Sequence, residues 1–203
     1  VGDNDVLFLA RHGSPHSVAP HLVNYRANIW ALHDAGVDGI LATYAVGGIA
    51  DFPVGHIVVP DQILDYTWGR QQDYNDIHGL KHYDFSYPFD ESLRRSLIDG
   101  AASAGLAHTV DGTYGCTQGP RLESVAEIDR LDRDGCTVVG MTAMPEAALA
   151  RELGVRYSGV CLVVNPAAGR GDGVIGENDI GNAVREGAKT LLRVLAGTIE
   201  RFD

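Results

Sequence analysis

Arg11, His12 and Gly13 follow directly on a short apolar run at residues 6–9. An arginine presents a planar fork of N–H donors that suits phosphate oxygens. A histidine beside it can donate a hydrogen bond to an anion or attack phosphorus as a nucleophile. The tripeptide therefore indicates a phosphate site and leaves two chemistries open. Either His12 becomes phosphorylated, or both side chains hold a phosphate ion that is itself the attacker. A surface or packing role is the alternative without chemistry.

A pair of glycines and a carboxylate follow two later apolar runs. Residues 44–46 lead into Gly47-Gly48, where backbone N–H groups can point at an anion, although a plain turn has the same sequence. Glu123 follows a Gly-Pro turn and is expected in the first turn of a helix. The helix dipole alone stabilises a carboxylate there, and the same group can accept hydrogen bonds from the N–H groups of a heterocycle.

Two further runs end in residues suited to a nucleoside. Met141 offers a soft apolar surface, and Thr142 offers a hydroxyl that could also be only a helix cap. Asn165 can donate to one ring atom and accept from another, as purine recognition requires, or it can tie down its own turn. Each group has a structural explanation, but together they end successive apolar runs, which favours one shared site.

Alternating apolar periodicities predict the elements that position these residues. Strands are predicted at residues 6–9 (buried), 39–46, 56–60, 107–116, 136–141 and 157–164. Helices are predicted at 24–35, 91–104, 121–134, 145–153 and 178–198. Residues 62–90 are expected to be a long irregular connection, a kind of segment that is often functional. The pattern predicts an α/β protein in one domain, residues 1–203, with a central, largely parallel or mixed sheet flanked by helices. Ligands in open α/β sheets bind at the strand ends, where the candidates fall.

Composition excludes several classes of partner. The 203-residue chain has 45% hydrophobic residues and a net charge of -11, which argues against nucleic acid and anionic membrane surfaces. No apolar run approaches the roughly 20 residues of a membrane span. Its three cysteines, Cys116, Cys136 and Cys161, lack metal-ligand spacing, so we expect no metal and reduced thiols in a cytoplasmic protein.

Several long motifs occur in a fixed order that resembles a known family. They include LARHG, VPDQILDYT, QGPRLES, MPE and VVNPAAG, and the likeness extends from Val6 to about Ala196. The sequence is similar to the trimeric purine nucleoside phosphorylases, more closely to the methylthioadenosine phosphorylase branch and most closely to the S-methyl-5'-thioinosine phosphorylases. The resemblance implies a pentosyltransferase that cleaves a purine nucleoside with inorganic phosphate as co-substrate and uses no cofactor. It also implies a homotrimer or a hexamer.

The same resemblance implies roles for individual residues. Phosphate would be bound by Arg11, His12, the backbone of Ala45 and the hydroxyl of Thr142. Met141 would lie against the ribose, and Leu122, Glu123, Asn165, Pro166 and Ala167 would surround the base. His82 would reach the 5' end of a neighbouring subunit's substrate, and Val174 or Ile175 would line that 5' pocket.

Asn165 and Ala167 suggest which base is cleaved. The adenine-selective branch has aspartates at both positions, so the acceptor for a 6-amino group is absent here, while an amide can donate to a 6-oxo group. A mismatched buried polar pair costs about 1–3 kcal/mol, which predicts hypoxanthine first and guanine second.

S-methyl-5'-thioinosine is the expected substrate. Inosine or guanosine, methylthioadenosine, and nucleoside binding without catalysis are alternatives. A histidine phosphatase would need a second arginine and a second histidine in contexts not found here.

One family feature is absent from the sequence. The family carries a glycine-rich phosphate loop on a strand that should precede Val6, and the segments 47–55 and 71–79 are shorter than the family leads us to expect. The sequence is interpreted as lacking residues rather than as a truncated homologue.

Overall fold

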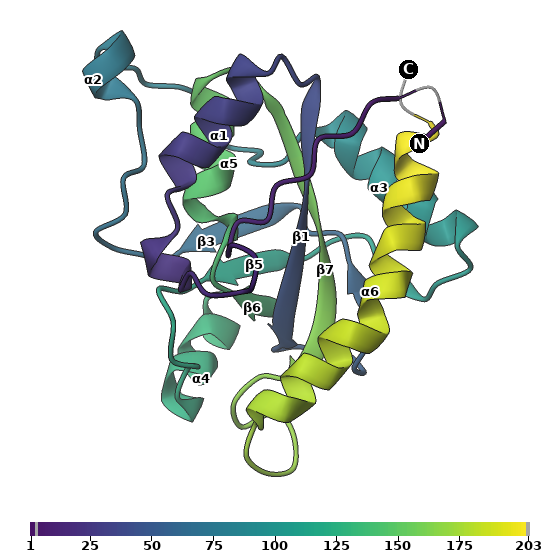
Figure 1. Cartoon of the computed structure of the whole chain (residues 1–203). Coiled ribbons are helices and arrows are strands. Elements are labelled where there is room, and N and C mark those ends of the chain that lie inside the picture. Colours follow the sequence, from purple (N-terminus) through teal and green to yellow (C-terminus); the bar gives the residue numbers. More distant parts are fainter. Residues whose placement is uncertain (3, 202–203) are drawn as a thin grey trace.

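A seven-stranded mixed sheet forms the centre of the computed structural model, which describes residues 1–2 and 4–201 (Figure 1). The strand order within the described part is β3-β5-β6-β1-β7-β2-β4. The strands are β1 (Gly39–Gly48), β2 (Ile57–Val58), β3 (Gln62–Asp65), β4 (His108–Thr109), β5 (Thr113–Cys116), β6 (Val138–Gly140) and β7 (Arg156–Pro166). The helices are the 3-10 turn η1 (Pro20–Leu22), α1 (Tyr25–Asp34), α2 (Asn75–His78), α3 (Glu91–Ser103), α4 (Val125–Arg133), α5 (Ala143–Glu152) and α6 (Glu177–Ile199). The predicted fold class is confirmed.

The two longest strands of the described sheet are β1 and β7, which pair in parallel. Its register runs from Gly39 opposite Arg156 to Gly48 opposite Pro166, so both strands end at the same edge. β6 pairs antiparallel with the last two residues of β1, and β5 runs parallel to β6. This arrangement brings the end of β1, the start of β6 and the end of β7 to one place, which is why residues distant in sequence can share a site.

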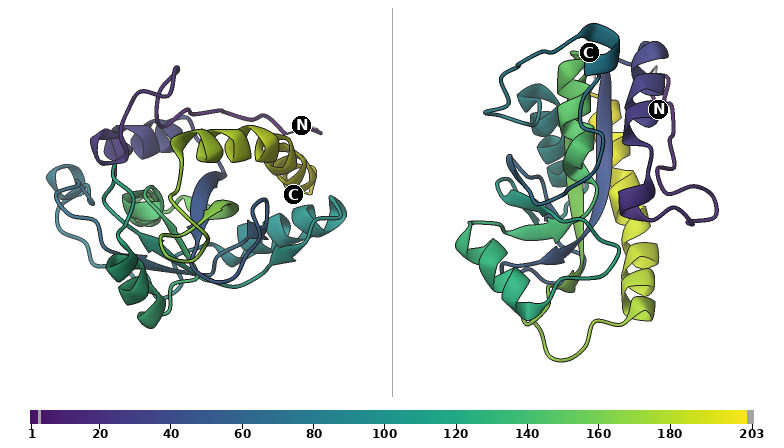
Figure 2. Two further views of the ribbon diagram at one scale, coloured as in Figure 1. Left: turned by 90° about the horizontal axis from the view of Figure 1, so that it is seen from below. Right: turned by 90° about the vertical axis from the view of Figure 1, so that its left-hand side faces the viewer.

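Helices cover the two sides of the long strands. α6 and α1 lie on one side of β1 and β7, and α4 lies on the other (Figure 2). One buried cluster joins α1 and α5 to the sheet around Tyr44 and Tyr114, and a second joins α3 and α6 to β7 around Leu97 and Leu162. A third cluster holds α4 against β6 through Ile128. Burying these apolar side chains supplies most of the driving force for this arrangement.

Local capping signals set where the helices begin. Asn24 and Asp90 accept hydrogen bonds from backbone N–H groups in the first turns of α1 and α3. Ser124 and Glu127 form a reciprocal capping box. That box is the reason that α4 begins at Val125 and not at the predicted residue 121, and it places Glu123 before the helix, not in its first turn.

The predicted strand at residues 6–9 is wrong. Residues 6–9 have no regular secondary structure, and Val6, Leu7 and Phe8 are 52%, 58% and 91% exposed. None of the strands in the described part pairs with them. An apolar run predicts that a segment can be buried in a sheet, but the strand also needs a hydrogen-bonding neighbour, which a local pattern cannot supply.

Two other predictions need correction. The connection at 62–90 contains the strand β3, which pairs in parallel with β5, and the short helix α2. The single strand predicted at 107–116 is two strands, β4 and β5. The chain turns between them, where the N–H of Gly112 donates to the carboxylate of Asp61 at 2.8 Å instead of to a strand.

Across residues 1–2 and 4–201, no helix combines the length and the apolarity that a membrane crossing would require.

Replacing Gly159 with alanine tests the packing of the central strands. A Cβ atom at this position of β7 would overlap the ring of Tyr44 on β1, and that ring is fully buried. We expect Gly159→Ala to lower the free energy of unfolding by about 1–3 kcal/mol in urea titrations, because the core must shift to make room. Gly181→Ala is the control, since its Cβ would lie 3.6 Å from the nearest neighbour, on α6. It should leave stability unchanged or raise it by up to about 1 kcal/mol, and equal losses in both variants would contradict the packing argument.

Candidate active site

Arg11 is fixed by a buried carboxylate. Its Nε and Nη2 donate to the two oxygens of Glu146 at 2.7 and 2.9 Å, and its Nη1 donates to the carbonyl of Thr43 at 2.9 Å. The side chains are 17% and 5% exposed. Burial works against the charge of Arg11, but the neighbouring Glu146 more than offsets it, and the pKa of the guanidinium is raised. Arg11 therefore stays charged in one orientation.

Two N–H groups of Arg11 remain for a ligand. A guanidinium has five N–H donors, and the bonds to Glu146 and Thr43 use three of them. The remaining two, one on each terminal nitrogen, suit two oxygens of one phosphate. Because the ion pair with Glu146 has little net charge, binding of an anion here depends on directed hydrogen bonds as much as on attraction.

Two tyrosines complete the surroundings of Glu146. Tyr157 donates to Glu146 Oε2 at 2.8 Å, and its hydroxyl is in turn hydrogen-bonded to that of Tyr44. Burial raises the pKa of both phenols well above the usual value of 10, so they stay protonated. The guanidinium of Arg11 also lies 5.6 Å from the centre of the Tyr44 ring. The carboxylate of Glu146 is thus bonded directly to Arg11 and to Tyr157 on β7. Tyr44 on β1 supports it through the hydroxyl of Tyr157.

His12 has a defined tautomer. Its Nδ1 lies 2.8 Å from the carbonyl of Val18, and a carbonyl only accepts, so Nδ1 carries a proton. Burial lowers the pKa of His12 below 6.5, which keeps the ring neutral at pH 7 and leaves Nε2 as an acceptor. The ring is stacked on His16 with centroids 4.3 Å apart. A neutral His12 can accept a hydrogen bond from the P–OH group of monohydrogen phosphate.

The ends of β5 and β6 come together through a close contact. Gly119 has φ +62°, and a Cβ there would overlap the sulfur of Met141, so only glycine fits. The hydroxyl of Thr117 donates to the carboxylate of Glu123 at 2.5 Å and holds it near the end of β5. Thr142 occupies the N-cap of α5, but its hydroxyl makes no capping hydrogen bond. It therefore has no capping role that competes with a ligand.

Asn165 lies at the end of β7 beside the glycine pair of β1. It pairs with Gly47, and a Cβ on Gly47 would come within 3.4 Å of both the Asn165 amide nitrogen and Ala167. The amide nitrogen donates to the carbonyl of Pro166 at 2.6 Å, so the structural role considered for Asn165 also holds. One amide N–H and the amide oxygen remain, and Ala167 is buried.

The structure does not bring every predicted residue together. His82 is exposed on the irregular segment after α2, while Val174 and Ile175 lie in the loop between β7 and α6. These two segments lie toward opposite ends of the molecule (Figure 1). Leu122 is exposed beside α4, and Ala45 is exposed on β1.

Two residues near the site were not predicted. Glu146 lies 135 positions from Arg11, and its signal was an acidic side chain within the otherwise apolar start of α5. Arg70 donates to backbone carbonyls of residues 117, 118, 141 and 144. It lies three residues after the motif VPDQILDYT, and nothing local to it indicates those partners.

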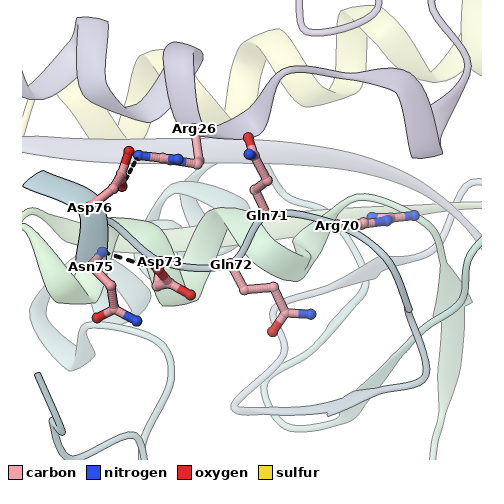
Figure 3. A pocket seen from close by; sticks show the side chains of 7 residues that line it. All are labelled: Arg26, Arg70, Gln71, Gln72, Asp73, Asn75 and Asp76. Atoms are coloured by element: carbon pink, nitrogen blue, oxygen red, sulfur yellow. Dashed lines mark hydrogen bonds and ion pairs between the residues drawn. The ribbon is translucent and has the colours of Figure 1, made fainter. Parts of the chain in front are cut away.

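Two open cavities of about 630 and 270 Å³ lie on either side of Arg26 and Arg70. The larger is lined by polar side chains of α1 and residues 70–76, among them the ion pair of Arg26 and Asp76 (Figure 3). Neither is lined by Asn165 or Met141. Hydrogen-bonding geometry, not cavity size, therefore marks the site at the strand ends.

These features define an α/β protein in which Arg11 and Asn165 keep N–H donors beyond those that bond to the protein. Residues 3–200 match the phosphorylase superfamily, and the chain belongs to that family. It is 53% identical to a probable S-methyl-5'-thioinosine phosphorylase of Pseudomonas syringae pv. tomato, with 98% of this chain and 85% of the relative aligned. It is 42% identical to a 6-oxopurine nucleoside phosphorylase of Pyrococcus furiosus, with 98% and 78% aligned.

Solved structures show the same fold. Methylthioadenosine phosphorylase from Schistosoma mansoni in complex with adenine superposes with a TM-score of 0.88 at 29% identity, over 94% of this chain and 74% of that one. The complex of that enzyme with tubercidin gives a TM-score of 0.87 at 30% identity, over 94% and 74%. The nucleoside phosphorylase architecture expected from the sequence is confirmed.

Substituting Glu146 tests the buried ion pair. Glu146→Gln keeps the shape but leaves Arg11 buried without a counter-charge, which costs on the order of 3–5 kcal/mol of unfolding free energy. The control is Arg95→Gln, which breaks an exposed pair with Glu91 and should cost less than about 1 kcal/mol. Urea unfolding at neutral pH measures both. A loss at Glu146 no larger than that at Arg95 would show that the pair does not organise this region.

Proposed function

We propose that this chain is a purine nucleoside phosphorylase that converts S-methyl-5'-thioinosine and phosphate into hypoxanthine and 5-methylthioribose 1-phosphate, in purine salvage. The observation that carries the proposal is the 53% identity, over 98% of the chain, to a protein named for that activity. The chemistry of Arg11, Thr142 and Asn165 also supports it, because a guanidinium and a hydroxyl suit phosphate and an amide suits a purine.

Phosphate is the proposed nucleophile. Two N–H groups of Arg11, the Thr142 hydroxyl and the backbone at Ala45 hold it, and His12 Nε2 accepts a hydrogen bond from its P–OH group. Held below the ribose, phosphate attacks the anomeric carbon as the bond to the purine breaks. Fixing its position turns a bimolecular encounter into an oriented one. His12 is a ligand in this scheme and never carries a phosphoryl group.

The leaving purine takes up negative charge. As the bond between sugar and base breaks, positive charge develops on the ribose and electrons move into the ring. Asn165 donates its free N–H to N7 or O6, and a donor already aimed at developing charge lowers the barrier. The charge of the bound phosphate stabilises the cation-like ribose from the opposite side. Met141 packs against the sugar, while Leu122, Glu123, Pro166 and Ala167 border the base.

The base preference rests on Asn165 and Ala167. The relatives named for 6-oxopurines and the structural neighbour solved with adenine have related folds, so the fold alone does not choose the base. An amide at 165 can donate to a 6-oxo group, and the methyl of Ala167 offers no acceptor for a 6-amino group. Hypoxanthine is the expected base, with guanine second.

The remaining proposals concern the 5' end of the substrate, the oligomeric state and the cellular location. His82 is exposed, and its segment lies toward the opposite end of the molecule from the loop that carries Ile175, which supports donation of His82 to a neighbouring subunit in a homotrimer or a hexamer (Figure 1). Ile175 borders the 5'-methylthio group. Residues 1–203 act as one domain in the cytoplasm, with inorganic phosphate as co-substrate and no cofactor.

A panel of substrates tests the reaction. Purified protein should release hypoxanthine from S-methyl-5'-thioinosine only when phosphate is present, and faster than it cleaves inosine or methylthioadenosine. Liquid chromatography of the free bases measures all three rates. If methylthioadenosine proves the best substrate by a wide margin, the argument from Asn165 fails. If bases bind but no nucleoside is cleaved, a binding protein is the better description.

Exchanging the two residues at the end of β7 should shift the base preference. In the double variant Asn165→Asp, Ala167→Asp, a protonated carboxyl group can donate to N7 and a second carboxylate can accept from a 6-amino group. We expect the ratio of kcat/KM for methylthioinosine over methylthioadenosine to fall about tenfold to a hundredfold. Ala168→Asp serves as the control, because residue 168 follows the same turn but has no proposed contact with the base. An equal change of this ratio in Ala168→Asp would show that residues 165 and 167 do not select the base.

A further inference from the structure

Arg70 makes more hydrogen bonds to backbone carbonyls than any proposed ligand of the substrate. Nη1 donates to the carbonyls of Met144 and Met141 at 2.6 and 2.8 Å. Nη2 donates to the carbonyls of Gln118 and Thr117 at 2.9 and 3.2 Å. Nε donates to the side-chain oxygen of Gln118 at 3.3 Å. In Figure 3 the side chain of Arg70 points away from the other labelled side chains of the larger cavity.

These contacts occupy the whole donor set of Arg70. A guanidinium has five N–H groups, and six acceptors surround them: the five named above and the hydroxyl of Tyr25, which lies 3.4 Å from Nη1. Its carbon also lies 5.3 Å from the centre of the Tyr25 ring, which fixes the plane of the group from α1. Arg11, in contrast, has two N–H groups free. Arg70 therefore has no donor left for phosphate, and its role differs from that of Arg11.

The carbonyls that Arg70 binds belong to two separate segments of the site. Thr117 and Gln118 follow β5 and lead toward Glu123, which the proposed function places at the base. Met141 and Met144 lie on either side of Thr142, which the proposed function places at the phosphate. The two segments also meet elsewhere: Gly119 packs closely against Met141, and the N–H of Met144 donates to the sulfur of Cys116 at 3.3 Å. Arg70 adds hydrogen bonds from a single side chain to carbonyls of both segments.

We propose that Arg70 is a positioning residue that sets the distance between the base-binding segment 117–123 and the phosphate-binding segment 141–144. The inference rests on the proposed function for its kinetic consequence but not for its structural one. Displacing positioned groups by about an ångström can cost on the order of a hundredfold in rate. Lysine cannot replace Arg70, because an ammonium has three donors at one point and cannot reach both segments.

Kinetics of Arg70→Lys and Arg70→Ala test the proposal. Both variants should lose about tenfold to a hundredfold in kcat/KM, with a lower kcat and a higher KM for phosphate. Added guanidinium chloride, at concentrations far below those that unfold the protein, should restore part of the activity of Arg70→Ala. The same concentration of sodium chloride should not. A residue that only stabilised the fold would leave the kinetics of the folded fraction unchanged.

Arg94→Ala is the matched control. Arg94 is also a buried arginine, and it bonds to the carbonyl of Val110 and to the carboxylate of Asp111 before β5 begins. Its loss should lower the unfolding midpoint while kcat and KM stay at wild-type values, and guanidinium should not change its activity. If Arg94→Ala and Arg70→Ala lose and regain activity alike, the positioning role is overturned.

The two methionines of the chain give a readout that needs no activity. Met141 and Met144 are the only methionines, and both lie in the segment that Arg70 holds. In protein labelled with ¹³C at the methionine methyl groups, both signals should shift or broaden in Arg70→Lys and stay in place in Arg94→Ala. Unmoved signals together with wild-type kinetics would overturn the proposal. An inactive wild-type protein would refute the proposed function instead, and the methyl signals would still decide whether Arg70 positions the segment.

Discussion

The buried ion pair between Arg11 and Glu146 is the interaction on which the arrangement of the site depends. An arginine with all its donors in solvent would not favour one direction, whereas the bidentate contact fixes the plane of the guanidinium and leaves one edge open. The same carboxylate ties the irregular segment around Arg11 to α5 and, through Tyr157, to β7. Because a buried pair gains little net stability over apolar packing, its benefit here is orientation.

Arg11 and Arg70 use their hydrogen-bond donors in different ways. Arg11 gives three donors to protein and keeps two, while Arg70 gives all five to protein. Arg11 therefore keeps N–H donors that are not bonded to the protein, whereas Arg70 uses its donors on the surrounding backbone. Such a division suits a reaction with opposite charges developing on its two sides, since stabilising both requires that the distance between the two sets of donors stay constant.

Local sequence patterns predict most of the fold, whereas the roles of the candidate site residues stay predictions. Helix periodicity and apolar runs predicted the helices and the strands β1 and β7 closely, because those signals are local. Predictions failed where a partner distant in sequence decides the outcome: residues 6–9 lack a paired strand, and Glu146 acquires its role only through Arg11. The sequence also contains the capping box of Ser124 and Glu127, which predicts the start of α4 at Val125.

A change of the preferred base does not require a change of fold. A 29% identical enzyme solved with adenine has the same architecture at a TM-score of 0.88, while a 42% identical relative is named for 6-oxopurines. The β1–β7 pairing that places residue 165 beside Gly47 depends on backbone hydrogen bonds, which are indifferent to whether that side chain is an amide or a carboxyl group. The fold therefore accommodates either side chain at position 165 without a change in the pairing of β1 and β7.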